Sequence, residues 1–340
     1  VATVQSMVAR VFRSSEGRPT PGMYDLVIVD EAHRGYALDG ELSDEDIEFR
    51  STEDYLSKYR RVLDYFDAVK VGLTATPALQ TTEIFGAPVY RYSYRQAVVD
   101  GYLTDHLPPK RIVTALNTAG ITFKGGEEVS ILDPSTGVID TATLPDDMGF
   151  EVQQFNKRVY TEPFNRVVAQ TIASEVPPDE DGKTLIFAAR DDHADLLVRL
   201  LNEELQAEYG EDAVPNDLVM KITGQTDRAG DAIRRYRSDA RPKYVVTVDM
   251  LSTGVDIPKI TNLVFVRRVN SRILYDQMIG RATRLCPEIN KTEFRIFDAV
   301  DLYDNLQSMT DMRPVVTNPH LSFTQLAADL ANAPDEASRK

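Results

Sequence analysis

Short, unbroken apolar segments recur along the 340-residue chain and constrain its fold more than any other feature. Most are continuous rather than alternating, as expected for parallel strands that are covered on both faces. Stretches of helical period lie between them, so the sequence predicts an α/β fold with right-handed crossovers. The strand candidates are residues 26–30, 69–74, 184–188, 218–222, 244–248, 263–266 and 294–297.

Two of the intervening stretches carry an apolar face of helical period. In the first, Ser51 is the candidate N-cap, and the face is formed by Tyr55, Leu56, Tyr59, Val62, Leu63 and Phe66. In the second, the face is formed by Leu196, Leu197, Leu200 and Leu201.

The strand–helix rhythm breaks between residues 108 and 160, where Gly, Pro, Thr and acidic residues are frequent. Segments 121–124 and 129–132 predict short β-hairpins there. We therefore expect a first α/β lobe over 1–107, a linker with a small β insertion over 108–160, a second lobe over 161–300 and a helical extension over 301–340.

The formal net charge is −15, whereas a protein that holds DNA by overall attraction is normally basic. This charge argues against non-specific duplex binding by the whole surface. A local basic groove remains compatible with it, because salt screens charges beyond about 10 Å.

Cysteine usage and hydropathy bear on location. The single cysteine, Cys286, excludes an intrachain disulfide and fits a reducing compartment. No apolar run reaches the length of a membrane span, and the N-terminus lacks a signal-peptide pattern, so we expect a cytoplasmic location. Cys286 has no metal-ligand spacing, and His193 is expected to be a helix cap or a surface residue rather than a ligand.

Two carboxylates, Asp30 and Glu31, directly follow the apolar run at 26–29. A buried parallel strand delivers such residues to the carboxyl edge of its sheet, where ligands bind. One carboxylate can hold Mg²⁺ through its water shell, and the other can orient a water for attack on a phosphate. Asp-Glu-Ala-His at 30–33 therefore predicts the Walker B box of a nucleic-acid-driven ATPase, with a capped helix start as the alternative.

A second strand candidate ends in Thr-Ala-Thr-Pro at 74–77. The hydroxyls of Thr74 and Thr76 can hydrogen-bond a neighbouring acid and relay its state, and Pro77 fixes the exit of the chain. An ordinary strand-to-loop turn is an equally good interpretation of these four residues alone, but the acids at 30–31 favour the functional one.

The segment 245–258, VVTVDMLSTGVDIP, is a strand candidate followed by a polar loop. Thr247, Ser252 and Thr253 can contact a nucleic-acid backbone, and they are the candidate DNA-binding residues. Gly254 permits backbone geometry that side chains forbid, and Asp256 can face a nucleotide ribose. The alternative is an ordinary turn between a strand and a helix.

Gln277, Arg281 and Arg284 are spaced by four and three residues, so a helix beginning near Ser271 would place them on one face. Two arginines displayed together suit an arginine finger, which stabilises charge on a transferring phosphoryl group. A solvated basic face paired with nearby acids is the alternative.

In this order, these four motifs resemble those of the superfamily two helicases and translocases. Longer stretches narrow the match to the motor (R) subunit of type I restriction enzymes, which the chain resembles along nearly its whole length. They include DEAHRGYALD, SKYRRVLDYFDAVKVGLTATPALQTTEIFG, YSYRQAVVDGYLTDHLPP, GKTLIFAA, SRILYDQMIGRATRLC and FRIFDAVDLY. Residues 1–7 resemble the strand motif that shortly precedes the DEAH box in such motors.

The resemblance implies two RecA-like lobes that bind ATP and Mg²⁺ in their cleft and move double-stranded DNA. It also implies two partners, a modification methyltransferase subunit and a specificity subunit. The implied roles are Mg²⁺ binding for Asp30, general base for Glu31, coupling for His33, Thr74 and Thr76, nucleotide contact or lobe coordination for Gly254 and Asp256, and γ-phosphate contact for Gln277, Arg281 and Arg284.

The sequence departs from the family in lacking a G-x-x-x-x-G-K-[ST] phosphate loop. The fragment Gly182-Lys183-Thr184 precedes a strand candidate instead of following one. We therefore expect a segment of a longer motor whose first lobe is incomplete at its N-terminus. The alternatives are a non-catalytic docking or DNA-binding module, or another superfamily two enzyme, such as a type III restriction subunit or a repair helicase.

Overall fold

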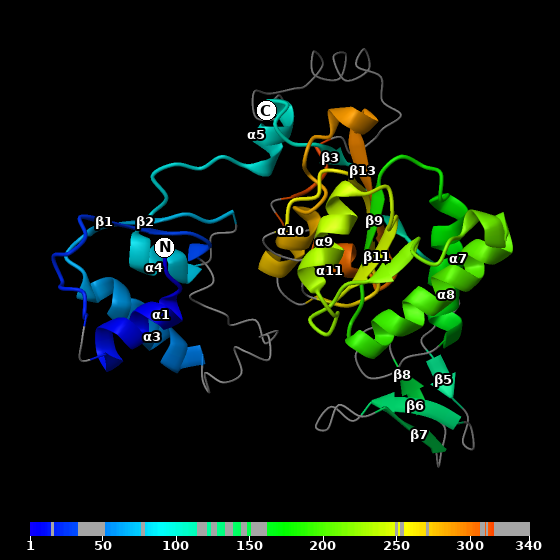
Figure 1. Cartoon of the computed structure of the whole chain (residues 1–340), viewed down its shortest axis with the longest axis horizontal. Helices are drawn as coiled ribbons and strands as arrows, with labels where there is room; N and C mark the ends of the chain where they lie inside the picture. The colour runs from blue at the N-terminus through cyan, green and yellow to red at the C-terminus, as the bar shows by residue number, and fades with distance from the viewer. Residues whose placement is uncertain are drawn as a thin grey trace, which may run out of the picture. The chain divides into compact units, whose positions relative to one another are not determined.

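The computed structural model describes residues 1–14, 17–32, 52–75, 79–113, 162–248, 251, 255–269, 272–306, 310 and 312–315, with the backbone of four short strands between 121 and 150. The chain divides into two compact units, Val1–Tyr92 and Ser93–Lys340 (Figure 1). They are referred to below as the first and second units, and each is described by itself.

The first unit contains two parallel strands with helices beside them. Strands β1 (Leu26–Val29) and β2 (Val69–Gly72) pair in register from Leu26↔Val69 to Val29↔Gly72. The helical segments are α1 (Val4–Val8), the π-helical η1 (Ala9–Arg13), α3 (Thr52–Tyr65) and α4 (Leu79–Phe85). The strand expected within residues 1–7 is wrong, because Val4–Val8 is helical.

Helix α3 packs its apolar face into a small core. Tyr59, Val62, Leu63 and Phe66 are buried, which confirms the predicted face over its second half. The side chains of Tyr55 and Leu56, and the candidate cap Ser51, lie outside the described residues. Val8 and Val11 of α1 and η1 join Val62 and Phe66 in one cluster.

The second unit is built on a parallel sheet with strand order β10-β11-β9-β12-β13-β3, and β4 also pairs with β13. All the described strand pairs of this sheet are parallel. The strands are β3 (Asp105–His106), β4 (Lys110–Arg111), β9 (Lys183–Phe187), β10 (Val219–Lys221), β11 (Tyr244–Thr247), β12 (Ile260–Phe265) and β13 (Glu293–Asp298). Together with β1 and β2, five of these confirm all seven predicted strand positions.

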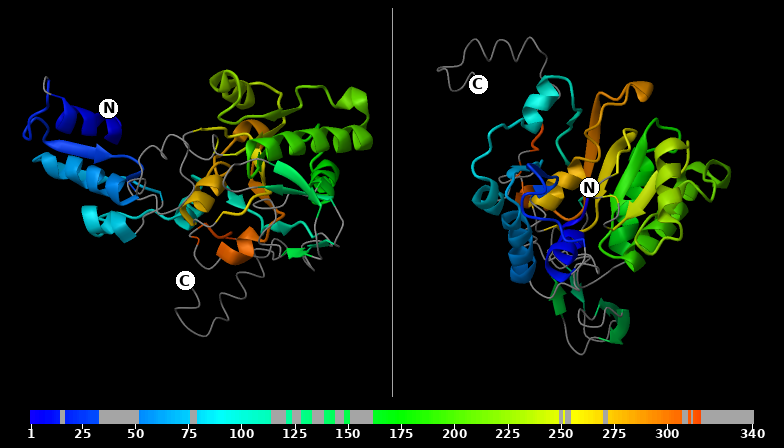
Figure 2. Two further views of the ribbon diagram at one scale, coloured as in Figure 1. Left: turned by 90° about the horizontal axis from the view of Figure 1, so that it is seen from below. Right: turned by 60° about the vertical axis from the view of Figure 1, so that its left-hand side comes forward.

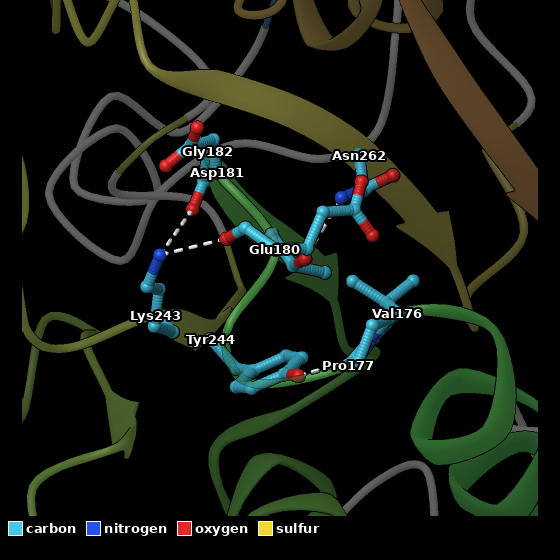
Figure 3. A pocket seen from close by; sticks show the side chains of 9 residues that line it. Val176, Pro177, Glu180, Asp181, Gly182, Lys243, Tyr244 and Asn262 are labelled. Atoms are coloured by element: carbon cyan, nitrogen blue, oxygen red, sulfur yellow. Dashed lines mark hydrogen bonds between the residues drawn. The ribbon is translucent and has the colours of Figure 1, made fainter. Parts of the chain in front are cut away.

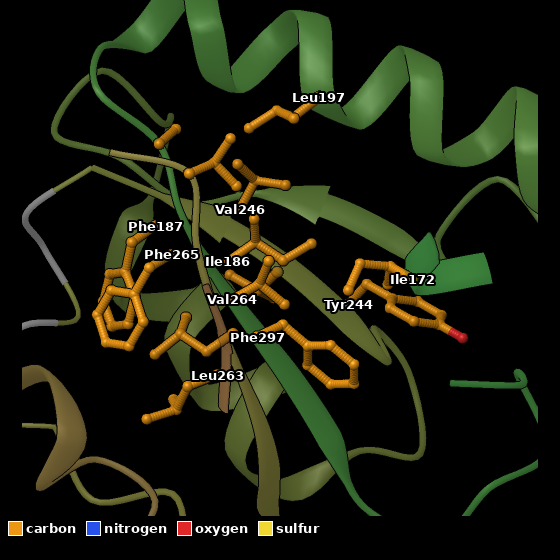
Figure 4. Close-up of a cluster of buried hydrophobic side chains, with 14 of the residues drawn as sticks. Ile172, Ile186, Phe187, Leu197, Tyr244, Val246, Leu263, Val264, Phe265 and Phe297 are labelled. Atoms are coloured by element: carbon orange, nitrogen blue, oxygen red, sulfur yellow. The ribbon is translucent and has the colours of Figure 1, made fainter. Parts of the chain in front are cut away.

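Helices cover both faces of this sheet (Figure 2). Figure 4 shows Leu197 of α8 (Asp191–Tyr209) on the same side of the strands as Val246, Ile186 and Val264. On the other side, Phe187 and Phe265 stack with centroids 5.3 Å apart. The helices are α5 (Tyr94–Val99), α7 (Glu162–Glu175), α8 (Asp191–Tyr209), α9 (Ala229–Ser238), α10 (Arg272–Ile279) and α11 (Leu302–Leu306), with 3-10 turns η4 (Glu211–Ala213) and η5 (Pro287–Ile289).

Helix α8 bears on one expectation about an apolar segment. Leu197, Leu200 and Leu201 of α8 are buried and Leu196 packs against the core, which confirms the predicted apolar face. Among the described residues, no helix combines the length and the apolar character needed to cross a membrane.

The edge of the sheet is formed by residues that the sequence predicts to be the end of the first lobe. Leu107 N donates to Phe294 O at 3.0 Å, and Ile112 N donates to Asp298 O at 2.8 Å. These bonds satisfy the exposed edge of β13, so residues 93–112 fold with the second unit. The boundary expected at residue 107 therefore falls inside the second unit, and the division lies between Tyr92 and Ser93.

The β insertion consists of two antiparallel pairs. Strand β5 (Ile121–Phe123) pairs with β8 (Met148–Phe150), and β6 (Glu128–Leu132) pairs with β7 (Ile139–Thr143). The hairpin predicted at 129–132 is confirmed. The segment at 121–124 pairs with a strand 25 residues further on, across the other pair, rather than with its neighbour.

His193 lies inside the second unit rather than at a cap or on the surface, and it is only 1% exposed. Its Nδ1 accepts a hydrogen bond from Ala189 N at 3.1 Å, so Nε2 carries the proton and donates to Asn165 Oδ1 at 2.9 Å. Burial lowers the pKa of His193 to about 3, because the imidazolium would lose its hydration.

This depressed pKa predicts a loss of stability in acid. The unfolded chain binds the His193 proton near pH 6.5, whereas the native state resists it to about pH 3. The native state therefore has no penalty from His193 above pH 6.5, and it loses stability as the pH falls from 6.5 towards 3, on the order of 5 kcal/mol in all. Urea unfolding between pH 4 and 7 should show a shallower pH dependence for His193→Gln than for wild type; equal slopes would contradict the assignment.

Candidate nucleotide and nucleic-acid site

The carboxyl ends of β1 and β2 are joined by backbone hydrogen bonds beyond the strands themselves. Leu73 N donates to Val29 O at 2.8 Å, and Ala32 N donates to Leu73 O at 2.9 Å. The turn that carries Asp30 and Glu31 is therefore fastened beside Leu73 and Thr74. The structure thus brings the two carboxylates and the first threonine of the Thr-Ala-Thr-Pro motif to one edge of the pair.

Glu31 has an unusual backbone conformation at this edge. Its φ is 49°, in the left-handed region that side chains rarely adopt. Its N–H donates to Asp30 Oδ1 at 2.9 Å, which helps to hold the turn. Strained backbone of this kind costs on the order of 1–3 kcal/mol and is concentrated at functional sites. The turn thus places two successive carboxylates, those of Asp30 and Glu31, directly after β1.

The donor set fits magnesium better than a metal that requires a full protein cage. Among the described residues, no group of three or more His, Cys, Asp or Glu side chains could hold an ion. Mg²⁺ keeps several waters and is usually bound through one or two carboxylates together with substrate phosphates. Asp30 is exposed at the strand tip and can serve in this way. His33 and Thr76 lie outside the described residues, and Thr74 is half-buried.

In the second unit, the predicted arginines lie after the helix rather than on it. Helix α10 ends at Ile279, so the expectation that Gln277, Arg281 and Arg284 share a helical face is wrong. After Gly280 the chain tightens, with Arg281 N bonded to Met278 O at 3.2 Å. Residues 280–286 are called the arginine loop below.

Four of the predicted site residues nevertheless come together here. Arg281 Nε donates to Gln277 O at 3.2 Å, and its Nη1 donates to Val255 O at 2.7 Å. Arg284 Nε lies 3.5 Å from Asp256 Oδ1, with both side chains more than half exposed. The first contacts fix Arg281, whereas the exposed ion pair contributes about 0–1 kcal/mol.

Sequence reasoning missed the role of Val255. The motif search weighed side chains, but Val255 contributes its backbone carbonyl, which every residue possesses. The one indication of this role in the sequence is the position of Val255, which immediately precedes Asp256. The carboxylate of Asp256 pairs with Arg284. Residues 255 and 256, which lie between β11 and β12 in the chain, are thus both joined to the arginine loop.

The candidate DNA-binding residues are only partly described. Ser252, Thr253 and Gly254 lie outside the described residues. Thr247 is fully buried at the end of β11, so its side chain offers no surface to DNA in this structure. Its Oγ1 has no hydrogen-bond partner within the described part of the chain. Burial at a strand end explains the failure of the expectation, since the side chain points into the core.

The fragment at 182–184 has a structural explanation. Lys183 Nζ donates to Asp239 O and Pro242 O, each at 2.8 Å, and burial lowers its pKa to about 8. Gly182 has φ of 104°, and a Cβ there would lie 2.3 Å from Thr261 Oγ1. Both residues therefore support the amino end of β9 instead of a phosphate.

A small pocket lies beside this fragment, lined among others by Glu180, Lys243 and Tyr244 (Figure 3). Its volume of about 10 Å³ is far below the roughly 300–1,000 Å³ typical of ligand sites. Lys243 Nζ donates to Glu180 O at 2.8 Å across it. The pocket therefore lacks the room for a nucleotide.

Two family models match parts of the chain. Residues 167–286 match the helicase conserved C-terminal domain. Residues 1–79 match the res subunit of type III restriction enzymes. The first match contains Val255, Asp256 and the whole arginine loop, and the second contains Asp30, Glu31 and Thr74.

Curated relatives extend the similarity along the chain. The chain is 48% identical, over 98% of its length, to the EcoKI endonuclease subunit of a type I restriction enzyme from Escherichia coli strain K12. It is 28% identical, over 93% of its length, to the corresponding EcoAI subunit from Escherichia coli. The chain spans 28% and 38% of the lengths of these two relatives.

Solved structures support the fold. A fragment of an HsdR subunit of a type I restriction enzyme from Vibrio vulnificus matches with a TM-score of 0.54 and 24% identity, covering 87% of this chain and 47% of that one. The helicase Lhr from Mycobacterium smegmatis matches with a TM-score of 0.51 and 17% identity, covering 88% and 31%. With two RecA-like lobes and this sequence identity, the chain is a homologue of a segment of the type I restriction enzyme endonuclease subunit.

Proposed function

We propose that the chain is the ATP-dependent motor part of a type I restriction enzyme R subunit, which translocates double-stranded DNA. The observation that carries this proposal is the joining of Asp30, Glu31 and Thr74 at the carboxyl ends of β1 and β2. This arrangement has the parts that phosphoryl transfer to water needs from a first lobe, namely a metal-holding acid, a base and a polar neighbour.

In this proposal, Glu31 accepts a proton from the water that attacks the γ-phosphate, and Asp30 holds the magnesium ion. When bound, Mg²⁺ neutralises charge on the phosphate oxygens. Glu31 has a left-handed backbone conformation in this turn, which is the kind of strain that is concentrated at functional sites. His33, Thr74 and Thr76 are proposed to couple the state of the nucleotide to DNA.

The second unit is proposed to supply the positive charge. Arg281 and Arg284 stabilise charge on the transferring phosphoryl group, while Gln277, Gly254 and Asp256 contact the nucleotide. The guanidinium group suits this role because its planar fork matches phosphate oxygens in pairs. Ser252 and Thr253 are proposed to contact the DNA backbone, with Thr247 supporting their loop from inside.

The remaining parts of the proposal concern the assembly. Homology to a restriction enzyme subunit supports a multi-subunit complex on DNA. We propose that its other members are a modification methyltransferase subunit and a specificity subunit, and that it acts in the cytoplasm.

DNA-stimulated ATP hydrolysis tests the proposal. We expect hydrolysis from the full polypeptide that contains this segment and its upstream sequence, because a phosphate loop is needed to cradle the phosphates. The 340-residue segment alone should hydrolyse ATP poorly. A folded full polypeptide without DNA-stimulated hydrolysis would instead favour a docking or DNA-binding module, and full activity of the segment would refute the need for a phosphate loop.

The general base can be tested by Glu31→Gln in the full polypeptide. The amide cannot accept the proton, so kcat should fall by about 100-fold or more, while the nucleotide Kd changes little. Glu211→Gln, which removes a carboxylate from the exposed turn η4, is the matched control and should hydrolyse at the wild-type rate. Wild-type hydrolysis by Glu31→Gln would remove Glu31 from the mechanism.

Arg281→Ala tests the contribution of the second unit. An arginine that acts on the transition state should lower kcat by about 1,000-fold when it is lost, with the ATP Kd changed by only a small factor. Hydrolysis rates and nucleotide titrations separate the two effects. Arg237→Ala, on the exposed side of α9, controls for loss of a guanidinium, and equal losses in kcat and affinity for Arg281→Ala would argue against a finger role.

A further inference from the structure

Three successive carbonyl groups of the arginine loop accept hydrogen bonds from donors outside the loop. Lys291 Nζ donates to Ala282 O at 2.6 Å. Thr104 N donates to Thr283 O at 2.7 Å, and Thr104 Oγ1 donates to Arg284 O at 3.2 Å. These carbonyls belong to the two residues between the arginines and to Arg284 itself. Lys291 and Thr104 therefore fix the path of the backbone that carries both arginines.

Thr104 is itself held in place. It is only 2% exposed and lies between α5 and β3. The hydroxyl of Tyr94 lies 3.1 Å from Thr104 O and 3.2 Å from Asp105 Oδ1. Strand β3, which begins at Asp105, pairs with β13 of the central sheet. The backbone of Thr104 is thus held by Tyr94 and by the strand that follows it, so the hydrogen bonds that Thr104 donates can fix the position of the arginine loop.

Lys291 connects the arginine loop to a second segment of the site. Its Nζ also donates to Pro258 O at 3.1 Å, three residues after the Val255 carbonyl that receives Arg281. Lys291 is 9% exposed, and burial lowers its pKa to about 8. The ammonium thus sets the spacing between the arginine loop and residues 255–258, which is the gap that Arg281 crosses.

A buried cation is an expensive way to fill this space. Removing an ammonium from water costs several kcal/mol after relaxation, whereas a methionine of similar length would fill the gap without that cost. Two backbone carbonyls offset part of the cost, but they are neutral acceptors. The ammonium is therefore better explained by the hold it exerts on both segments than by packing.

We propose that Thr104 and Lys291 are positioning residues for ATP hydrolysis, which hold the arginine loop so that Arg281 and Arg284 face the nucleotide. The inference rests on the function proposed above for this loop. Neither residue touches the reacting atoms, so each acts through the arginines. Thr104 lies in residues 93–112, which follow the first unit in the chain. Its hydrogen bonds therefore also attach these residues to the arginine loop.

The test uses the full polypeptide and Thr104→Val, which removes the hydroxyl but keeps the backbone N–H. We expect kcat for DNA-stimulated hydrolysis to fall about tenfold with the KM for ATP within about twofold, because misplaced catalytic groups cost rate more than binding. Thr104→Ser should restore the rate. Thr171→Val, whose hydroxyl donates to Val167 O within α7, is the matched control and should leave kcat unchanged.

Lys291→Met is a second variant, for which we also expect kcat to fall about tenfold with little change in the KM for ATP. A double variant that carries Arg281→Ala tests whether Thr104 acts through Arg281. If Thr104 acts through Arg281, adding Thr104→Val to Arg281→Ala should lower kcat by less than about twofold more. A full further tenfold loss in the double variant would overturn this route. Wild-type kcat in both Thr104→Val and Lys291→Met, with Arg281→Ala still impaired, would overturn the inference and leave the proposed function standing.

Hydrogen exchange gives a readout that does not depend on catalysis. Loss of the hydroxyl should accelerate amide exchange in residues 280–286 by about fivefold, without change in α7 or α8. This measurement shows whether Thr104 holds the loop even if the wild-type polypeptide hydrolyses no ATP. Absence of hydrolysis would contradict the proposed function but not the role of Thr104 in holding the loop. Unchanged exchange in the loop would defeat the inference.

Discussion

The second unit depends on the burial of its central parallel strands. Strands β9, β11 and β12 are covered on both faces, and Leu185, Val245 and Leu263 are fully excluded from solvent. Parallel strands with two covered faces have only their ends available for polar chemistry. Residues 255–258 lead into the amino end of β12, and there their backbone meets the arginine loop.

Much of the fold could be predicted because its signals are local. Continuous apolar runs identified seven strands, and helical period identified the buried faces of α3 and α8. The edge strands β3 and β4 were not predicted, because two residues each are too short for a periodic pattern. Their strand character comes from hydrogen bonds to β13, which is distant in the sequence. The division of the chain between Tyr92 and Ser93, rather than after residue 107, depends on the same distant contacts.

The candidate site also contains some residues whose positions could be predicted from the sequence and others whose positions could not. Asp30, Glu31 and Thr74 could be grouped from the sequence, because parallel strands bring consecutive strand ends to one edge. The helical face proposed for Gln277, Arg281 and Arg284 was wrong, because the helix stops before Gly280. Propensity alone does not mark this end, since Gly within a helix costs only about 1 kcal/mol. The position of the arginines is decided instead by tertiary hydrogen bonds.

These tertiary bonds explain why an arginine beyond a helix can still be well placed. A residue on a helix inherits its position from the i→i−4 ladder, whereas one in a loop needs donors and acceptors from elsewhere. In the arginine loop these come from Thr104, 180 residues before the carbonyl that its hydroxyl holds, and from Lys291 nearby. Each donor is buried, so water competes weakly for the carbonyls and the bonds are stronger than surface ones. The arginines are thus positioned by the core of the unit, even though Arg284 itself is exposed to solvent.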